Sequence, residues 1–271
     1  MARTELPIVA RQRVDAGEIL VRHAPARHRA AGAMRSVVLV HGMADSSNGW
    51  RAVLPLLPDH DVWTFDMPWS GTDGPRWATA RRAAQWLSLA LRLCPATPDV
   101  IVGHSFAATA LIDWALQEPH VDVPLLLLAP VFVADPVSVD WDYIDRFARS
   151  VPVQIQALLQ DRLPDRSSPT VAAAIARKLA GGLMPGGMLE LFSMIDRLSD
   201  APKVGLRGRV GILVGDGDSD MAQAGAAALA SQCGTPLQRI AACGHLIATS
   251  HPERVVAAID TVLRNRLREA A

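Results

Sequence analysis

What the sequence has little of already restricts what it can encode. Its three cysteines, Cys94, Cys233 and Cys243, are scattered and odd in number, which matches neither a disulfide framework nor a metal-ligand spacing. The longest apolar stretch, near residues 125–134, is too short to cross a bilayer, and the N-terminal residues contain no apolar core of signal-peptide length. We therefore expect a soluble, cytoplasmic protein with no membrane partner, whose cysteines are reduced packing residues.

An excess of charge of one sign is also missing. Lys and Arg together number 27, as do Asp and Glu, and no basic block suggests nucleic-acid binding. No cluster of His, Cys and Asp has metal-ligand spacing, and the glycines at 181–182 and 185–187 lack the strand–loop–helix context of a phosphate-binding loop. The sequence thus predicts no metal, no cofactor and a small or neutral partner, and it leaves the oligomeric state open.

Apolar residues make up 50% of the 271 positions, which is enough for one large core, and they follow two kinds of pattern. Runs at 8–14 and 18–23, split by a turn, predict an N-terminal hairpin. Short continuous apolar runs, typical of strands buried on both faces, occur at 37–40, 62–65, 100–102, 125–128 and 210–214. Helical patterns cover 79–93, 106–117, 223–232 and 252–267. Their alternation predicts an α/β fold with a mainly parallel, doubly wound sheet.

One segment interrupts the alternation. From about residue 135 to residue 202 the pattern is helical, without strands, and is broken by prolines and glycines. An insertion of this size predicts a helical cap, residues 135–202, on a core made of residues 1–134 and 203–271. Apolar cap residues, among them Met184, Met188 and Phe192, are candidates to line a substrate pocket. Packing within the cap is the alternative role for each of them.

A strand that ends in a serine is the most informative local pattern. The apolar run at 100–102 leads into Gly103-His104-Ser105-Phe106-Ala107 and then a helix-forming stretch, which is how a sharp strand-to-helix turn presents one hydroxyl at its apex. Small residues at 103 and 107 allow the two backbones to come close. Ser105 is therefore a candidate nucleophile, with an ordinary helix N-cap as the alternative.

A serine nucleophile needs a base and a third group that holds the base. His245 follows the apolar run at 237–241 and precedes the last helix, which makes it the candidate base. The loop after the strand at 210–214 supplies Asp218 as the preferred acid. Its rivals are Asp216, Asp220 and Asp135.

The same chemistry needs N–H donors for a developing oxyanion. The turn after the strand at 37–40 begins His41-Gly42-Met43, and its glycine allows the backbone to face a ligand. The amides of Met43 and Phe106 are the predicted donors. Gly42 is a candidate substrate contact, and His41 is expected to hydrogen-bond the turn.

These motifs resemble the α/β-hydrolase superfamily over nearly the whole chain. The matching pieces, in chain order, are 41–42, 66–73 in the place of the family's Asp-x-Pro-Gly-x-Gly-x-Ser-like turn, 103–107, 215–218 and 244–245. The order Ser, Asp, His is the one that this family uses. The resemblance implies the α/β-hydrolase fold with an inserted helical cap. Trp69 and Ala107 replace glycines often found in the family, and Trp69 is a candidate substrate contact.

The resemblance implies a serine hydrolase acting on an ester, thioester or lactone of a small, largely apolar acyl substrate. Carbon–carbon bond hydrolysis and the release or cyclisation of an acyl chain are alternatives within the fold. A receptor-like protein with slow or no turnover is the alternative of another class. Dehalogenases and epoxide hydrolases are disfavoured, because they use an aspartate where Ser105 stands and the latter need cap tyrosines, whereas Tyr143 is the single tyrosine.

Overall fold

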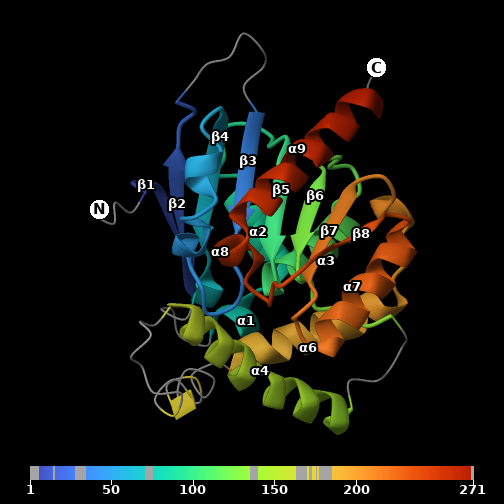
Figure 1. The fold of residues 1–271 in the computed structure, drawn as a ribbon. Coiled ribbons are helices and arrows are strands. Elements are labelled where there is room, and N and C mark those ends of the chain that lie inside the picture. The colour runs from blue at the N-terminus through green and yellow to red at the C-terminus, as the bar shows by residue number, and fades with distance from the viewer. Residues whose placement is uncertain are drawn as a thin grey trace.

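The computed structural model describes residues 6–14, 16–27, 35–70, 76–134, 140–162, 170, 173–174, 176 and 185–269. An eight-stranded sheet of order β1-β2-β4-β3-β5-β6-β7-β8 runs through the molecule (Figure 1). The strands are β1 (Ile8–Val14), β2 (Gly17–Ala24), β3 (Arg35–Val40), β4 (His60–Asp66), β5 (Val100–His104), β6 (Leu125–Leu128), β7 (Val210–Gly215) and β8 (Leu237–Ile240). β1 pairs antiparallel with β2 and β2 with β4, while the other pairs are parallel. The predicted hairpin, strands and α/β fold class are confirmed.

Both faces of the sheet are covered, which explains the continuous apolar strands. In β3, Val38 and Val40 belong to one core cluster and Val37 and Leu39 to the other, because successive side chains point to opposite faces. The first cluster is closed by α2 (Ala83–Leu91), α3 (Phe106–Gln117) and α7 (Asp220–Cys233). The second is closed by the 3-10 helix η1 (Ser47–Trp50), α8 (Ile247–Ser250) and α9 (Pro252–Glu269), and Figure 1 shows α9 crossing that face.

The prediction of one continuous helix over residues 79–93 is wrong, because the structure has two helices there. α1 (Trp77–Ala80) ends at Arg81, whose φ of −151° is extended, and α2 begins after Arg82. The indole N–H of Trp86 donates to the carbonyl oxygen of Trp77 at 3.1 Å, so the two short helices are joined by a side chain. Three further 3-10 helices are η2 (Leu54–Leu56), η3 (Pro68–Ser70) and η4 (Val204–Leu206).

Two long helices occupy the described part of the insertion between β6 and β7. They are α4 (Trp141–Arg162) and α6 (Pro185–Asp200), and they lie beyond the carboxyl ends of β5 and β6 (Figure 1). Phe192 of α6 meets the rings of Tyr143 and Phe147 of α4, with centroids 6.2 Å and 5.5 Å away. Within the described ranges, no helix has both the length and the hydropathy needed to cross a membrane.

Candidate active site

Ser105 stands at the apex of the turn from β5 to α3. Its φ of 53° and ψ of −115° are uncommon for a residue with a side chain, and its N–H donates to the Leu128 carbonyl oxygen at 2.8 Å. A Cβ at Gly103 would lie 2.6 Å from Leu111 Cδ1 and 3.0 Å from the Ala107 carbonyl oxygen. The expected close approach of strand and helix is therefore present, and alanine suffices at position 107.

His245 connects the serine to an acid. Its Nε2 lies 2.9 Å from Ser105 Oγ and its Nδ1 lies 2.8 Å from Asp218 Oδ2. Because an ionised carboxylate only accepts hydrogen bonds, Nδ1 carries a proton and Nε2 of the neutral ring is left to accept one from the serine hydroxyl. The three predicted side chains thus form one continuous hydrogen-bonded chain.

The structure separates Asp218 from its rivals. Asp218 is buried, and its Oδ1 also accepts the Ser219 N–H at 2.7 Å, whereas Asp216 and Asp220 are exposed. Asp135 lies outside the described residues. Burial raises the pKa of Asp218. The hydrogen bond and charge of His245, together with the Ser219 N–H, lower it by more than burial raises it, so the pKa lies below its ordinary value. The group facing His245 is therefore a carboxylate at neutral pH.

The turn after β3 is held from two sides. Ala44 has a φ of 56° and donates its N–H to the Trp69 carbonyl oxygen at 2.8 Å. Nδ1 of His41 donates to the Gly42 carbonyl oxygen at 2.7 Å, and its Nε2 accepts the Met67 N–H at 2.9 Å. One donating and one accepting nitrogen require a neutral ring, and burial accordingly lowers the pKa of His41. The expected hydrogen bond from His41 to this turn is confirmed.

An ion pair between β2 and β4 supports the end of the same turn. Nε of Arg22 donates to Asp66 Oδ2 at 2.9 Å, and Asp66 Oδ1 accepts the Ser47 N–H at 2.7 Å. Burial raises the pKa of Asp66, but the bonds from Ser47 and the charge of Arg22 outweigh it and lower the pKa. Asp66 therefore joins β2, β4 and the start of η1 as a charged group.

The two amides predicted to bind an oxyanion adjoin the serine. Phe106 follows Ser105 directly, and a Cβ on Gly42, the residue before Met43, would lie 3.3 Å from Ser105 Cβ. Among the described residues, neither amide N–H donates to a protein acceptor. Both are therefore free to donate to a ligand, and their role stays a prediction.

The predicted pocket residues have different surroundings. Trp69 is completely buried, donates its indole N–H to the His41 carbonyl oxygen at 3.1 Å and packs edge-on against Phe106. Gly42 is buried, and Met188 and Phe192 are half-buried on α6. Met184 lies outside the described residues. Which of these residues touch substrate stays a prediction.

Two contacts at the site were not anticipated. The Met43 side chain meets Gly187 of α6, since a Cβ there would lie 3.2 Å from Met43 Sδ. Nε2 of His104 lies 2.9 Å from the main-chain oxygen of His245. The sequence signals for these contacts are the Pro-Gly-Gly run at 185–187 and the histidine directly before Ser105. Neither signal identifies the residue that is contacted.

A family model and a curated relative place these features among known proteins. A model of the alpha/beta hydrolase family matches residues 37–258. A pimeloyl-[acyl-carrier protein] methyl ester esterase of Aromatoleum aromaticum is 29% identical over 252 residues, which cover 84% of this chain and 98% of the relative.

Solved structures share the fold at lower sequence identity. A haloalkane dehalogenase from Bradyrhizobium elkani is 17% identical with a TM-score of 0.64, covering 97% of this chain and 99% of its own. A thioesterase domain from the curacin biosynthetic pathway is 15% identical with a TM-score of 0.57, covering 95% and 100%. These likenesses extend over nearly the whole chain and show the fold alone.

Proposed function

Because the chain belongs to the alpha/beta hydrolase family, we propose that it is a serine hydrolase that cleaves a carboxylic ester through Ser105, His245 and Asp218. The observation that carries this proposal is the hydrogen-bonded chain from Ser105 Oγ through both ring nitrogens of His245 to Asp218. A serine hydroxyl becomes a useful nucleophile when such a base takes its proton, and the carboxylate then stabilises the imidazolium.

The proposed reaction has two halves. Ser105 Oγ attacks the ester carbonyl carbon while His245 Nε2 takes the hydroxyl proton, and this proton then passes to the departing alkoxide as the carbon–oxygen bond breaks. Water attacks the resulting acyl-serine with His245 again as base, which releases the carboxylic acid and restores the serine. In both halves the amides of Met43 and Phe106 donate to the oxyanion.

The proposed substrate carries a small, largely apolar acyl group. Support comes from the apolar side chain of Met43, in the turn beside Ser105, which packs against the core cluster that contains Trp69 and Phe106. The A. aromaticum relative is a methyl ester esterase, which favours an ester of an acyl chain over a thioester or lactone. We propose that residues 135–202 act as a cap over the core formed by residues 1–134 and 203–271, and exclude water from the acyl chain.

A turnover screen tests this function. Wild type, Ser105→Ala and the control Ser231→Ala, an exposed serine of α7, are compared on p-nitrophenyl and methyl esters of graded acyl length, acyl thioesters and lactones. We expect turnover that falls at least about a thousandfold in Ser105→Ala and is unchanged in Ser231→Ala. Equal turnover in all three proteins would remove Ser105 as the nucleophile.

A fluorophosphonate probe separates the enzyme from the receptor-like alternative. Labelling of Ser105 that is detected by intact mass, with turnover of one ester class, supports the hydrolase. Ligand-induced thermal stabilisation with neither labelling nor turnover would favour a binding protein.

A further inference from the structure

His104 lies between two loops of the site and is only 7% exposed. It ends β5, directly before Ser105. Its Nε2 lies 2.9 Å from the main-chain oxygen of His245. Since a carbonyl oxygen only accepts, Nε2 carries the proton and donates.

The other edge of the same ring packs against the turn that carries Met43. A Cβ on Gly42 would lie 3.1 Å from His104 Nδ1, so the ring fills the space beneath this turn. The His104 and His245 rings are tilted at 54°, with centroids 5.0 Å apart. His104 therefore contacts both the loop that carries His245 (residues 241–246, the base loop) and the turn that carries the predicted oxyanion donor Met43 (residues 41–46, the oxyanion turn).

The base loop makes few other main-chain hydrogen bonds near His245. The Cys243 N–H donates to Asp216 Oδ1 at 3.4 Å, and the Cys243 carbonyl oxygen accepts the Gly217 N–H at 2.9 Å. The Leu246 carbonyl oxygen accepts N–H groups of its own helix α8. Among the described residues, the main chain of His245 itself makes one hydrogen bond, which its carbonyl oxygen accepts from His104. It ties the base to the strand end that presents the nucleophile.

We propose that His104 is a positioning residue, whose Nε2–H holds the His245 carbonyl and so keeps the imidazole of His245 in line between Ser105 and Asp218. The inference rests on the proposed function and extends it to a residue that touches neither substrate nor the transferred proton. A shift of the base by about 1 Å can cost about a hundredfold in rate, which gives the scale of the effect.

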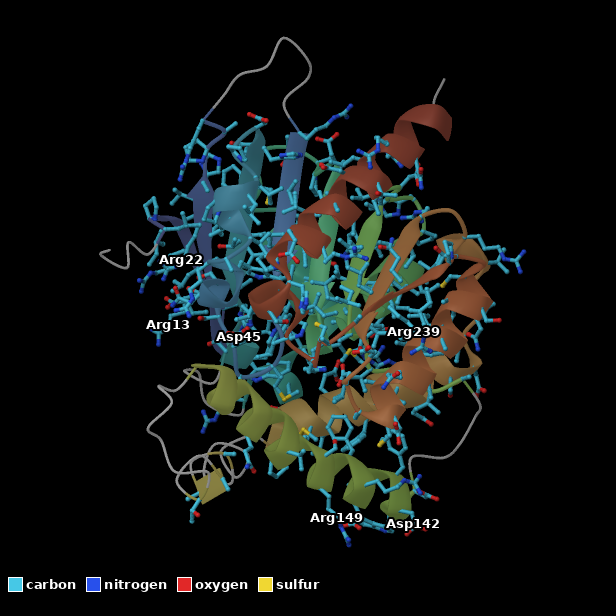
Figure 2. All side chains as sticks on the ribbon, viewed as in Figure 1. Arg13, Arg22, Asp45, Asp142, Arg149 and Arg239 are labelled. Carbon is cyan, nitrogen blue, oxygen red and sulfur yellow. The ribbon has the colours of Figure 1, made fainter. Side chains whose placement is uncertain are left out.

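The neutral form of His104 suits this position. Burial lowers its pKa to about 4, and the charge of His245 lowers it too, while the hydrogen bond to His245 and the charges of Asp45 and Asp218 act in the opposite direction. Asp45 lies at the end of the sheet nearest α4 (Figure 2). His245 becomes positive when it takes the serine proton, so a neutral neighbour adds no repulsion at that moment.

Three variants separate the donor from the volume of the ring. In His104→Gln the amide nitrogen reaches about as far as Nε2, in His104→Asn it reaches only as far as Nδ1, and His104→Leu has no donor. We expect His104→Gln to keep kcat within about threefold of wild type. We expect His104→Asn and His104→Leu to lose about ten- to a hundredfold in kcat and in the rate of Ser105 labelling by a fluorophosphonate, with little change in KM.

The outcomes distinguish this inference from the proposed function. Loss in Asn and Leu with rescue in Gln, at temperatures well below each thermal midpoint, supports the positioning role. Equal kcat in all variants overturns it, as does a loss in His104→Gln as large as in His104→Leu, or lowered thermal midpoints with unchanged labelling. If wild-type Ser105 neither labels nor turns over any ester, the proposed function fails and this role fails with it.

Discussion

Met43 of the turn after β3 rests against Gly187 of α6, which leaves little room for a side chain at position 187. A Cβ there would lie 3.2 Å from Met43 Sδ and 3.4 Å from Trp77 Cζ2. This contact joins the insertion to the turn that carries one predicted oxyanion donor. The placement of α6 and the shape of the site are therefore coupled.

Gly187→Val should disturb that contact. The branched side chain would displace Met43 and lower both the free energy of unfolding and ester turnover. Met43→Ala in the same chain should restore part of the loss, giving a coupling energy of at least about 0.5 kcal/mol in a double-mutant cycle by urea unfolding. Additive effects would mean that the two side chains do not share this space.

Asp218→Asn should abolish most of the activity. An amide can donate to His245 Nδ1 and hold the wrong tautomer, so we expect kcat to fall at least about a thousandfold. Asp216→Asn, which keeps the Oδ1 that accepts the Cys243 N–H at 3.4 Å, and Asp220→Asn, at the exposed start of α7, should stay near wild type. A comparable loss in either control would move the acid to that residue.

Gly215→Ala should be poorly tolerated at the end of β7. A Cβ at this position would overlap the Cys243 carbonyl oxygen and force the acid and base loops apart, whereas nothing lies within 4 Å of a Cβ on Gly205. We expect Gly215→Ala to lose at least about 2 kcal/mol in urea unfolding, and Gly205→Ala to change by less than about 0.5 kcal/mol. Equal stabilities would contradict the close packing.

Glu190→Gln should stabilise the protein at neutral pH. Glu190 Oε1 accepts the Ala83 N–H at 3.0 Å, and Arg197 lies between Glu190 and Asp113, at 3.4 Å and 2.8 Å. Burial raises the pKa of Glu190 despite these donors, with Asp113 adding to the increase. A folded chain that binds this proton more tightly loses stability as pH rises above 4.5, the unperturbed value.

The glutamine variant keeps the acceptor for Ala83 without the buried charge. Its urea midpoint should therefore exceed that of wild type at pH 7 and approach it at pH 4. A midpoint below wild type at pH 7 would show that the ion pair with Arg197 outweighs the cost of burial.

His104 should make the fold sensitive to acid. Because its pKa falls from 6.5 in the unfolded chain to about 4 in the folded chain, the unfolded state binds more protons between these values and stability declines as pH falls through them. The decline has an upper bound of about 3 kcal/mol, from 1.36 kcal/mol per unit. His104→Gln should lose less stability than wild type between pH 6.5 and pH 4.5 in urea unfolding, with the contribution of His41 common to both proteins. Parallel pH dependences would show that His104 is not buried in its neutral form.

Local patterns in the sequence were sufficient for most of the fold. The continuous apolar runs indicate strands that are buried on both faces of the sheet. The hairpin, the strands and α3 lie where these runs and the helical periodicity predicted them. The break at Arg81 was missed because the helical pattern continues across it, and the side-chain bond from Trp86 to Trp77 that joins the two pieces is not visible in periodicity.

The candidate site also combines features that local patterns predict with contacts that depend on distant segments. Sequence patterns alone were enough to predict a serine at the end of a buried strand, followed along the chain by an acid loop and a histidine, because strand ends and turns are local properties. Asp218, the acid predicted from the sequence, contacts His245 in the structure, but that contact, the hold of His104 on the His245 carbonyl and the meeting of Met43 with Gly187 are visible in the packed chain and not in its local patterns. These pairs are 27, 141 and 144 residues apart, so their distances depend on how the sheet and helices pack and not on any pattern within one segment.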